Sequence, residues 1–326
     1  MRTVSPASNH ALSSSTPSIS PLLGSSQLLV AAIAWGGMYG VSQIALASMD
    51  PYSMTTVRYG IGAVFFCLLL WLREGHTAFR FEGQFLRLWF YGSCGFCGFS
   101  ILLFHGLKHA PAEHGAVIAS LMPLISALIS WLRHGKRPDS ATLLCTLIAI
   151  IGVVLVISRG EVANLLQLDA IKGDLMIILG VTCWVVFSMG MSSLPRWSAS
   201  RYTALSCSAG LTTIVSANII ATLAGASTLP TPALIEPVLF EISYLVLAAG
   251  VLAVSCWSSG VVRMGALNAL LFMNMIPVSA FVISFVQGRE IHPMEIYGMT
   301  LVIMALLANN VLPRIQQAKR KPAVCT

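Results

Sequence analysis

Long uncharged stretches alternate with short charged segments along the chain from about residue 27 onward. Ten of these stretches are long enough to cross roughly 30 Å of hydrocarbon as α-helices. The ten-residue alternation typical of membrane β-barrels is missing from the sequence. We therefore predict helical spans at residues 27–49, 54–72, 88–107, 114–132, 141–158, 175–195, 202–223, 242–262, 267–287 and 296–312.

The same pattern indicates an internal repeat. An offset of 154 residues aligns Gly106 with Gly260 and Pro123 with Pro277. A unit with an odd number of helices enters the membrane from the opposite side in its second copy, which produces inverted repeats. We predict an all-α integral membrane protein of ten transmembrane helices, arranged as two inverted five-helix repeats. Its expected parts are a disordered tail (1–26), a first repeat (27–158), a second repeat (173–313) and a basic tail (314–326).

Composition agrees with a lipid environment, and charge adds an orientation. Of 326 residues, 56% are hydrophobic and 10% are charged, whereas soluble domains carry about a quarter charged residues. Of the 19 Lys and Arg residues, 14 fall on the side that holds both termini. Basic loops face the cytoplasm, so we expect a multi-pass protein of the cell inner (plasma) membrane with cytoplasmic termini. The net charge of +7 then needs no nucleic-acid partner.

Catalytic and metal-binding motifs are missing from the sequence. It holds no Gly-x-Ser-x-Gly elbow, no HExxH and no phosphate-binding glycine loop with a lysine, so we expect neither an enzyme nor a cofactor. His105, His109 and His114 cluster near Glu113, but their spacing does not fit a zinc site, and no metal is expected. His105 and His114 stay candidates for a proton-responsive gate, with plain loop polarity as the alternative.

Several short motifs follow one another in a recognisable order. The chain resembles the drug/metabolite transporter superfamily, in its EamA-like branch, over roughly residues 25–315. The resemblance implies two five-helix repeats and a secondary carrier, most often an exporter. Glu290 matches an acidic position of the family, whereas Lys136 departs from the equivalent one. The motifs that carry the resemblance are Trp35-Gly-Gly-Met-Tyr39, Asp50-Pro51, Arg58-Tyr59, Gly173-Asp174-Leu175 with Trp184, and the stretches around Pro123 and Pro277.

Arg58 is the one charge inside a predicted span. Intramembrane charges usually face the bundle interior or a water-filled cavity, which makes Arg58 a candidate ligand for a substrate carboxylate or phosphate. The alternative is a structural role, in which Arg58 extends to the membrane surface or pairs with a helix-end carbonyl or with Asp50.

Two further groups are candidates for a central cavity. Aromatic and hydroxyl side chains recur in the first and sixth spans, where packing alone is an equal alternative. Pro123 and Pro277 each remove a backbone hydrogen bond and are expected to kink their helices. The polar residues three positions earlier are candidate substrate contacts. The substrate-binding candidates besides Arg58 are Trp35, Tyr39, Ser120, Trp184, Ser188 and Asn274.

The function that fits these features is transport of small metabolites, such as amino acids or amphiphilic compounds, by alternating access. A nucleotide-sugar or sugar-phosphate carrier is one alternative, although it needs more basic residues in the cavity. A non-transporting membrane subunit is the other. The expected partners are a small-molecule substrate and the lipid bilayer. Gly36 and Gly40 form a GxxxG motif, which fits internal packing or a homodimer.

Overall fold

Helices make up all the regular secondary structure in the residues that the computed structural model describes, which are 21–135, 140–161, 168–264, 269, 272–288 and 290–320. The first half of the chain contains α1 (Pro21–Leu46), α2 (Pro51–Glu74), the 3₁₀ turn η1 (His76–Phe79), α3 (Phe85–Gly92), the π-helical η2 (Ser93–Gly98), α4 (Phe99–Leu107), α5 (Ala112–Ala119), α6 (Met122–His134) and α7 (Ser140–Ser158).

The second half repeats this order of long and interrupted helices. It contains α9 (Leu168–Met191), α10 (Ala199–Leu223), α11 (Pro232–Ile235), the 3₁₀ turn η3 (Glu236–Val238), α12 (Leu239–Ser243), the π-helical η4 (Tyr244–Leu252), α13 (Ala253–Met264), α15 (Met275–Val286) and α16 (Pro293–Arg320).

The apolar helices make this a multi-pass membrane protein. Six continuous helical segments among the described residues have the length and hydropathy to cross a bilayer. The pair α5 and α6 passes the same test together but bends by 47° at its break. Three shorter apolar helices complete the set, at Leu143–Ser158, Met275–Val286 and Pro293–Ala305. Ten crossings stay a prediction, because only six unbroken helices among the described residues have the required length and hydropathy.

Some helices extend beyond the spans expected from hydropathy. α1 begins at Pro21 rather than at residue 27, and α9 begins at Leu168 rather than at 175. α16 continues to Arg320, into the expected basic tail. At α9 and α16, charged residues mark where hydrocarbon ends, but they do not break a helix, so charge placed these two boundaries too far inward. The added residues of α1, which include Ser25 and Ser26, are uncharged. Lys136, which departs from the acidic position of the family, lies outside the described residues.

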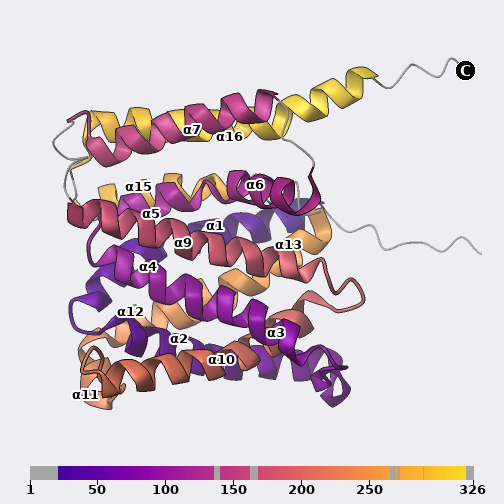
Figure 1. Ribbon diagram of the computed structural model, residues 1–326, viewed down its shortest axis with the longest axis vertical. Helices are drawn as coiled ribbons and strands as arrows, with labels where there is room; N and C mark the ends of the chain where they lie inside the picture. The colour runs from indigo at the N-terminus through magenta and orange to yellow at the C-terminus, as the bar shows by residue number, and fades with distance from the viewer. Residues whose placement is uncertain are drawn as a thin grey trace, which may run out of the picture.

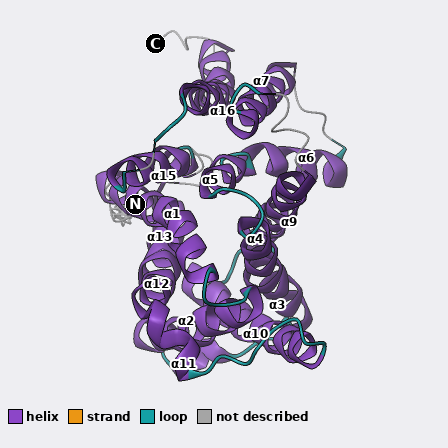
Figure 2. Ribbon diagram, turned by 90° about the vertical axis from the view of Figure 1, so that its left-hand side faces the viewer, coloured by secondary structure: helices purple, strands orange, loops and turns teal. Residues whose placement is uncertain are grey.

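The helices lie roughly parallel to one another, in layers (Figure 1). α2 and α10 pack together at one edge of the molecule, and α7 and α16 pack together at the opposite edge. Between them, α1 packs on α13 while α4 packs on α9, and these two pairs lie on opposite sides of the middle of the molecule (Figure 2). Each of these four pairs joins one half of the chain to the other.

Glycines allow two of these pairs to approach closely. A Cβ atom at Gly106 of α4 would lie 2.6 Å from the carbonyl oxygen of Gly173 in α9. A Cβ atom at Gly298 of α16 would lie 2.5 Å from the carbonyl oxygen of Gly152 in α7. Any larger residue would push these backbones apart, so glycine is required at both crossings.

The two halves carry interruptions at matching places. η2 lies between α3 and α4, and η4 lies between α12 and α13. The bend between α5 and α6 falls at Ser120 and Leu121, just before Pro123. Asn274 precedes α15 in the same way, three residues before Pro277. π-Turns and broken helices loosen the regular hydrogen-bond ladder and are frequent at functional sites.

Candidate functional site

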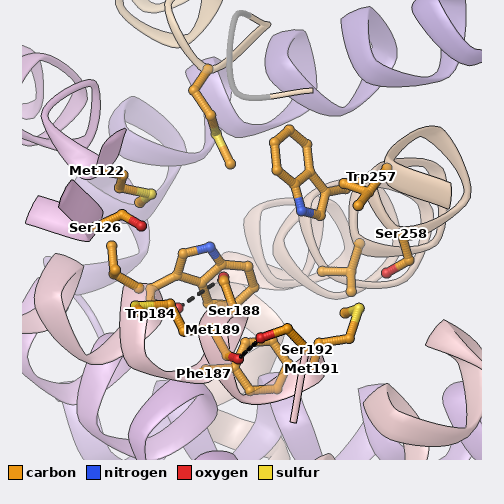
Figure 3. Close-up of a pocket in the computed structure, with 14 residues that line it drawn as sticks. Met122, Ser126, Trp184, Phe187, Ser188, Met189, Met191, Ser192, Trp257 and Ser258 are labelled. Carbon is orange, nitrogen blue, oxygen red and sulfur yellow. Dashed lines mark hydrogen bonds between the residues drawn. The ribbon is translucent and has the colours of Figure 1, made fainter. Parts of the chain in front are cut away.

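A cavity of about 240 Å³ lies between α6, α9 and α13, and we call it the vestibule. Figure 3 shows Trp184 and Trp257 projecting into it from α9 and α13, with Ser188 and Ser192 below. The lining is mostly apolar, with a few hydroxyls and four methionines, Met122, Met189, Met191 and Met273. Methionine side chains are flexible and polarizable, so such a lining adapts to apolar groups of different shape.

A smaller hollow of about 20 Å³ continues from the vestibule toward α2, and we call it the chamber. The two hollows share the side chains of Met122, Trp184, Val254 and Met273. The chamber also brings together candidates from distant parts of the sequence, because Trp35, Tyr39 and Arg58 all line it. Four of the seven substrate-binding candidates therefore meet in one place, since Trp184 belongs to both hollows.

Arg58 is buried, with 2% of its surface exposed. Its Nη2 atom lies 3.2 Å from the sulfur of Met38, and its Cζ atom lies 5.1 Å from the ring centre of Tyr59 and 5.7 Å from that of Phe104. Nε and Nη1 have no hydrogen-bond partner among the described residues. Asp50 instead accepts hydrogen bonds from Tyr52, Ser53 and Ser227. Arg58 therefore neither extends to the surface nor pairs with Asp50, as a structural role would have it.

This environment is unusual for a guanidinium group, which is always charged in proteins. Aromatic faces attract a cation, but each such contact contributes only about 1 kcal/mol or somewhat more when desolvated. Burial of an ion without a counter-ion has a penalty of several kcal/mol. The guanidinium group of Arg58 is thus under-compensated by the described part of the chain.

Three tryptophans surround the junction between vestibule and chamber. The rings of Trp35 and Trp184 meet edge to face with centroids 6.0 Å apart, and Trp257 lies 5.5 Å from Trp35. The indole N–H of Trp35 donates to the carbonyl of Ala249 at 3.0 Å. Ala249 lies in η4, so a π-helical turn fixes the orientation of Trp35.

The remaining candidates are placed differently. Ser188 lines the vestibule and donates to the carbonyl of Trp184 at 2.9 Å. Ser120 is fully buried at the break between α5 and α6, and its hydroxyl donates to the carbonyl of Val117. Asn274 is also fully buried, and neither atom of its amide has a partner among the described residues. Neither Ser120 nor Asn274 lines the two hollows.

The histidine cluster expected from the sequence is divided among separate contacts. Nδ1 of His114 lies 3.1 Å from a carboxylate oxygen of Asp174, and both side chains are buried. Asp174 lies within α9, beyond its first turn. His105 instead packs its ring against Tyr52, with centroids 5.1 Å apart. No group of three or more metal-binding side chains occurs among the residues with described positions.

Polar contacts join the two halves at one end of the helices, which we call the Asp50 end. Asp50 caps α2 by accepting hydrogen bonds from the backbone N–H groups of Tyr52 and Ser53 at 2.9 and 3.0 Å. It also accepts from the Ser227 hydroxyl at 2.8 Å, in the loop after α10. Partial burial raises the pKa of Asp50, but hydrogen bonds from Ser53, Ser227 and Thr228 outweigh this effect and hold the pKa below its usual value.

The opposite end, which we call the Ser198 end, has a matching cap on α10. The Ser198 hydroxyl accepts from the N–H of Arg201 at 2.9 Å and donates to Glu74 at 2.5 Å. Arg201 forms an ion pair with Glu82 at 2.7 Å. At the Ser198 end the capped helix is α10, and its contacts go to the end of α2 and the loop that follows α2. At the Asp50 end the capped helix is α2, and its contacts go to the loop that follows α10.

Sequence reasoning missed several cavity residues, notably Met122, Trp257 and Met273. Each lies in an apolar span and has the composition of an ordinary core or lipid-facing side chain. Two of them adjoin residues that the sequence did bring forward, because Met122 precedes Pro123 and Met273 precedes Asn274.

Comparisons with known proteins identify two copies of one family pattern. The model of the EamA-like transporter family matches residues 22–158 and again residues 171–311. The uncharacterized transporter YrdR of Bacillus subtilis (strain 168) is 30% identical over 303 residues, covering 91% of this chain and 94% of YrdR. YyaM of the same organism is 27% identical over 296 residues, covering 90% of this chain and 95% of YyaM. One solved crystal structure matches with a TM-score of 0.64 at 19% identity, over 90% of this chain and 97% of that one.

Proposed function

We propose that this chain, which belongs to the EamA-like transporter family, is a secondary carrier that moves small amphiphilic metabolites across the membrane by alternating access. The observation that carries the proposal is the chamber around Arg58, which opens into an apolar vestibule. A buried site that is reached through a larger cavity is expected for a carrier in a conformation that is open to one side of the membrane.

Matching features of the two halves support the inverted-repeat part of the proposal. π-Turns, broken helices and capped helices occur in equivalent positions, and the Asp50 and Ser198 caps exchange roles between opposite ends. If the ten crossings form two inverted units, exchange of their conformations moves the opening from one end to the other.

The direction in which the vestibule faces follows from charge. Met191, Ser192 and Val261 line the vestibule near the Ser198 end. Arg73, Arg196 and Arg263 belong to helix ends or loops at that end. By the positive-inside rule this end faces the cytoplasm, so the conformation is inward-facing. Export of a cytoplasmic metabolite would begin from this state.

Flux in proteoliposomes tests the carrier proposal. Val254 stands where vestibule and chamber meet, so Val254→Trp is expected to block saturable flux of labelled phenylalanine or another amphiphilic metabolite. Val215→Trp is the matched control, because Val215 is an exposed side chain of α10 that faces no described cavity. A labelled nucleotide sugar tests the alternative cargo. Absence of flux for every solute, from folded protein, would overturn the proposal in favour of a non-transporting subunit.

A further inference from the structure

The chamber has a marked charge imbalance. Its described lining consists of Arg58, aromatic rings and apolar side chains, and it contains no Asp or Glu. The same is true of the described lining of the vestibule. A substrate with a positive charge would therefore meet the cation of Arg58 in the chamber, and no carboxylate among the described lining residues of either hollow.

We propose that the substrates are amphipathic monocarboxylates, whose carboxylate binds the guanidinium of Arg58 while their apolar body occupies the vestibule. This inference rests on the carrier function and narrows its substrate class. It makes simple organic anions better ligands than amino acids of the same size, because an α-ammonium group finds no counter-charge among the described lining residues.

The donors of Arg58 support an anion rather than a neutral group. Nε and Nη1 are buried and unpartnered in the described part of the molecule. Charge-assisted hydrogen bonds to a carboxylate are about twice as strong as neutral ones. A carboxylate also supplies the missing counter-charge, which a hydroxyl or an amide cannot do.

Size and charge number favour a carboxylate over a phosphate ester. The chamber holds about 20 Å³, which is close to the space needed for a single water molecule. One guanidinium neutralises one negative charge, whereas a phosphate monoester carries between one and two at neutral pH. A carboxylate is smaller than a phosphate and matches the single charge, so it needs the smaller displacement of the chamber lining to reach Arg58.

The apolar part of the ligand is expected to be aromatic or branched. Trp184 and Trp257 project into the vestibule (Figure 3), and Met122 and Met273 connect it to the chamber. Aromatic rings stack on tryptophan faces and contact methionine sulfur favourably.

A matched ligand series tests the proposal on the full chain in lipid nanodiscs, through quenching of tryptophan fluorescence. The probes share a phenyl ring on a short alkyl chain: 3-phenylpropanoate is an anion, phenylalanine a zwitterion, 3-phenylpropanol neutral and 2-phenylethylamine a cation. We expect 3-phenylpropanoate to bind tightest, by about tenfold or more over the alcohol, the size of effect of a charge-assisted hydrogen bond.

Two substitutions of Arg58 complete the test. Arg58→Gln is expected to weaken 3-phenylpropanoate binding by about 10- to 100-fold and to leave the alcohol within about threefold. Arg58→Lys keeps the charge, so a preference for the anion should persist. Arg196→Gln, which removes a charge from an exposed loop, is the control and should change neither ligand.

The possible outcomes separate this inference from the carrier function. Tighter binding of the amine or the alcohol than of the anion, or an anion preference that survives in Arg58→Gln, would overturn the inference while flux of other solutes continued. If Arg58→Gln does not fold, the wild-type order of the four probes and the Arg58→Lys variant still decide. Loss of all flux in folded wild-type protein would instead overturn the carrier function itself.

Discussion

The Asp50 end and the Ser198 end are held together by similar residues in different surroundings. At the Asp50 end, His114 and Asp174 pair while both are buried, and Asp50 is partly buried among hydroxyl and N–H donors. At the Ser198 end, the Ser198–Glu74 contact is exposed, and Glu82 of the Arg201–Glu82 ion pair is 55% exposed.

The energetic value of these contacts differs accordingly. Exposed ion pairs contribute about 0–1 kcal/mol, whereas leaving one partner of a buried hydrogen bond unsatisfied costs about 1–3 kcal/mol, and more for a charged group. The vestibule lies near the weakly held Ser198 end. In this conformation the strong contacts close one end, and the weak contacts lie beside the opening.

The largest difference should follow from removal of Asp174. Asp174→Ala leaves the buried His114 without its acceptor, and we expect a loss of about 3 kcal/mol in the free energy of unfolding. Unfolding of the purified protein in mixed micelles measures it. Asp174→Asn keeps an acceptor oxygen and should lose less. A stability equal to wild type in Asp174→Ala would contradict the strong closure of this end.

Glycine substitutions extend the comparison to the helix crossings. A Cβ atom at Gly173 would lie 2.8 Å from the backbone oxygen of Gly106, which cannot move without its helix. A Cβ atom at Gly24, at the Ser198 end, would lie 2.7 Å from Cγ of Met264, a flexible side chain. We expect Gly173→Ala to lose about 2 kcal/mol and Gly24→Ala less than half of that. Equal thermal shifts for the two variants would remove the distinction between the crossings.

Acid should act on the Asp50 cap. The pKa of Asp50 is lower in the folded protein than its ordinary value, so its stabilising effect is fully present above about pH 4 and is lost as pH falls through the lowered pKa. Asp50→Asn keeps a capping oxygen and removes the charge, so it is expected to lose about 0.5 kcal/mol at neutral pH, typical of a negative charge at a helix N-terminus. The gap to wild type should shrink on acidification in melting curves. A gap that is constant with pH would show that Asp50 does not act through its charge.

The smallest effect is expected at Glu82. The hydrogen bond from Arg201 lowers the pKa of Glu82, while slight desolvation raises it. Because the carboxylate is exposed to water, Glu82→Gln should leave the melting temperature within experimental error. A decrease comparable to that of Asp174→Ala would show that the Ser198 end is as firmly held as the other.

Sequence reasoning predicted the helical architecture because apolar length is a strong local signal. It also brought Trp35, Tyr39, Arg58 and Trp184 forward as candidates, and these residues do meet at the chamber. The absence of a partner for Nε and Nη1 of Arg58 among the described residues was not predictable, since sequence does not show which carboxylates lie within reach.

The partner of His114 was unpredictable for a different reason. Asp174 is 60 residues away and belongs to the other half of the chain, in a helix that the hydropathy pattern began only at residue 175. The apolar cavity residues Met122 and Trp257 were not predicted, because methionine and tryptophan occur equally well at positions that face lipid. Long-range packing alone distinguishes the two settings.

The paired π-turns give both halves a looser stretch of helix at the same place. A π-turn holds one more residue than the α-turn it replaces, and π-turns are frequent at functional sites. η2 and η4 lie in equivalent helices of the two family matches. In η4 the carbonyl of Ala249 accepts a hydrogen bond from the indole N–H of Trp35. A change of register within η4 would therefore turn the Trp35 ring at the junction of vestibule and chamber.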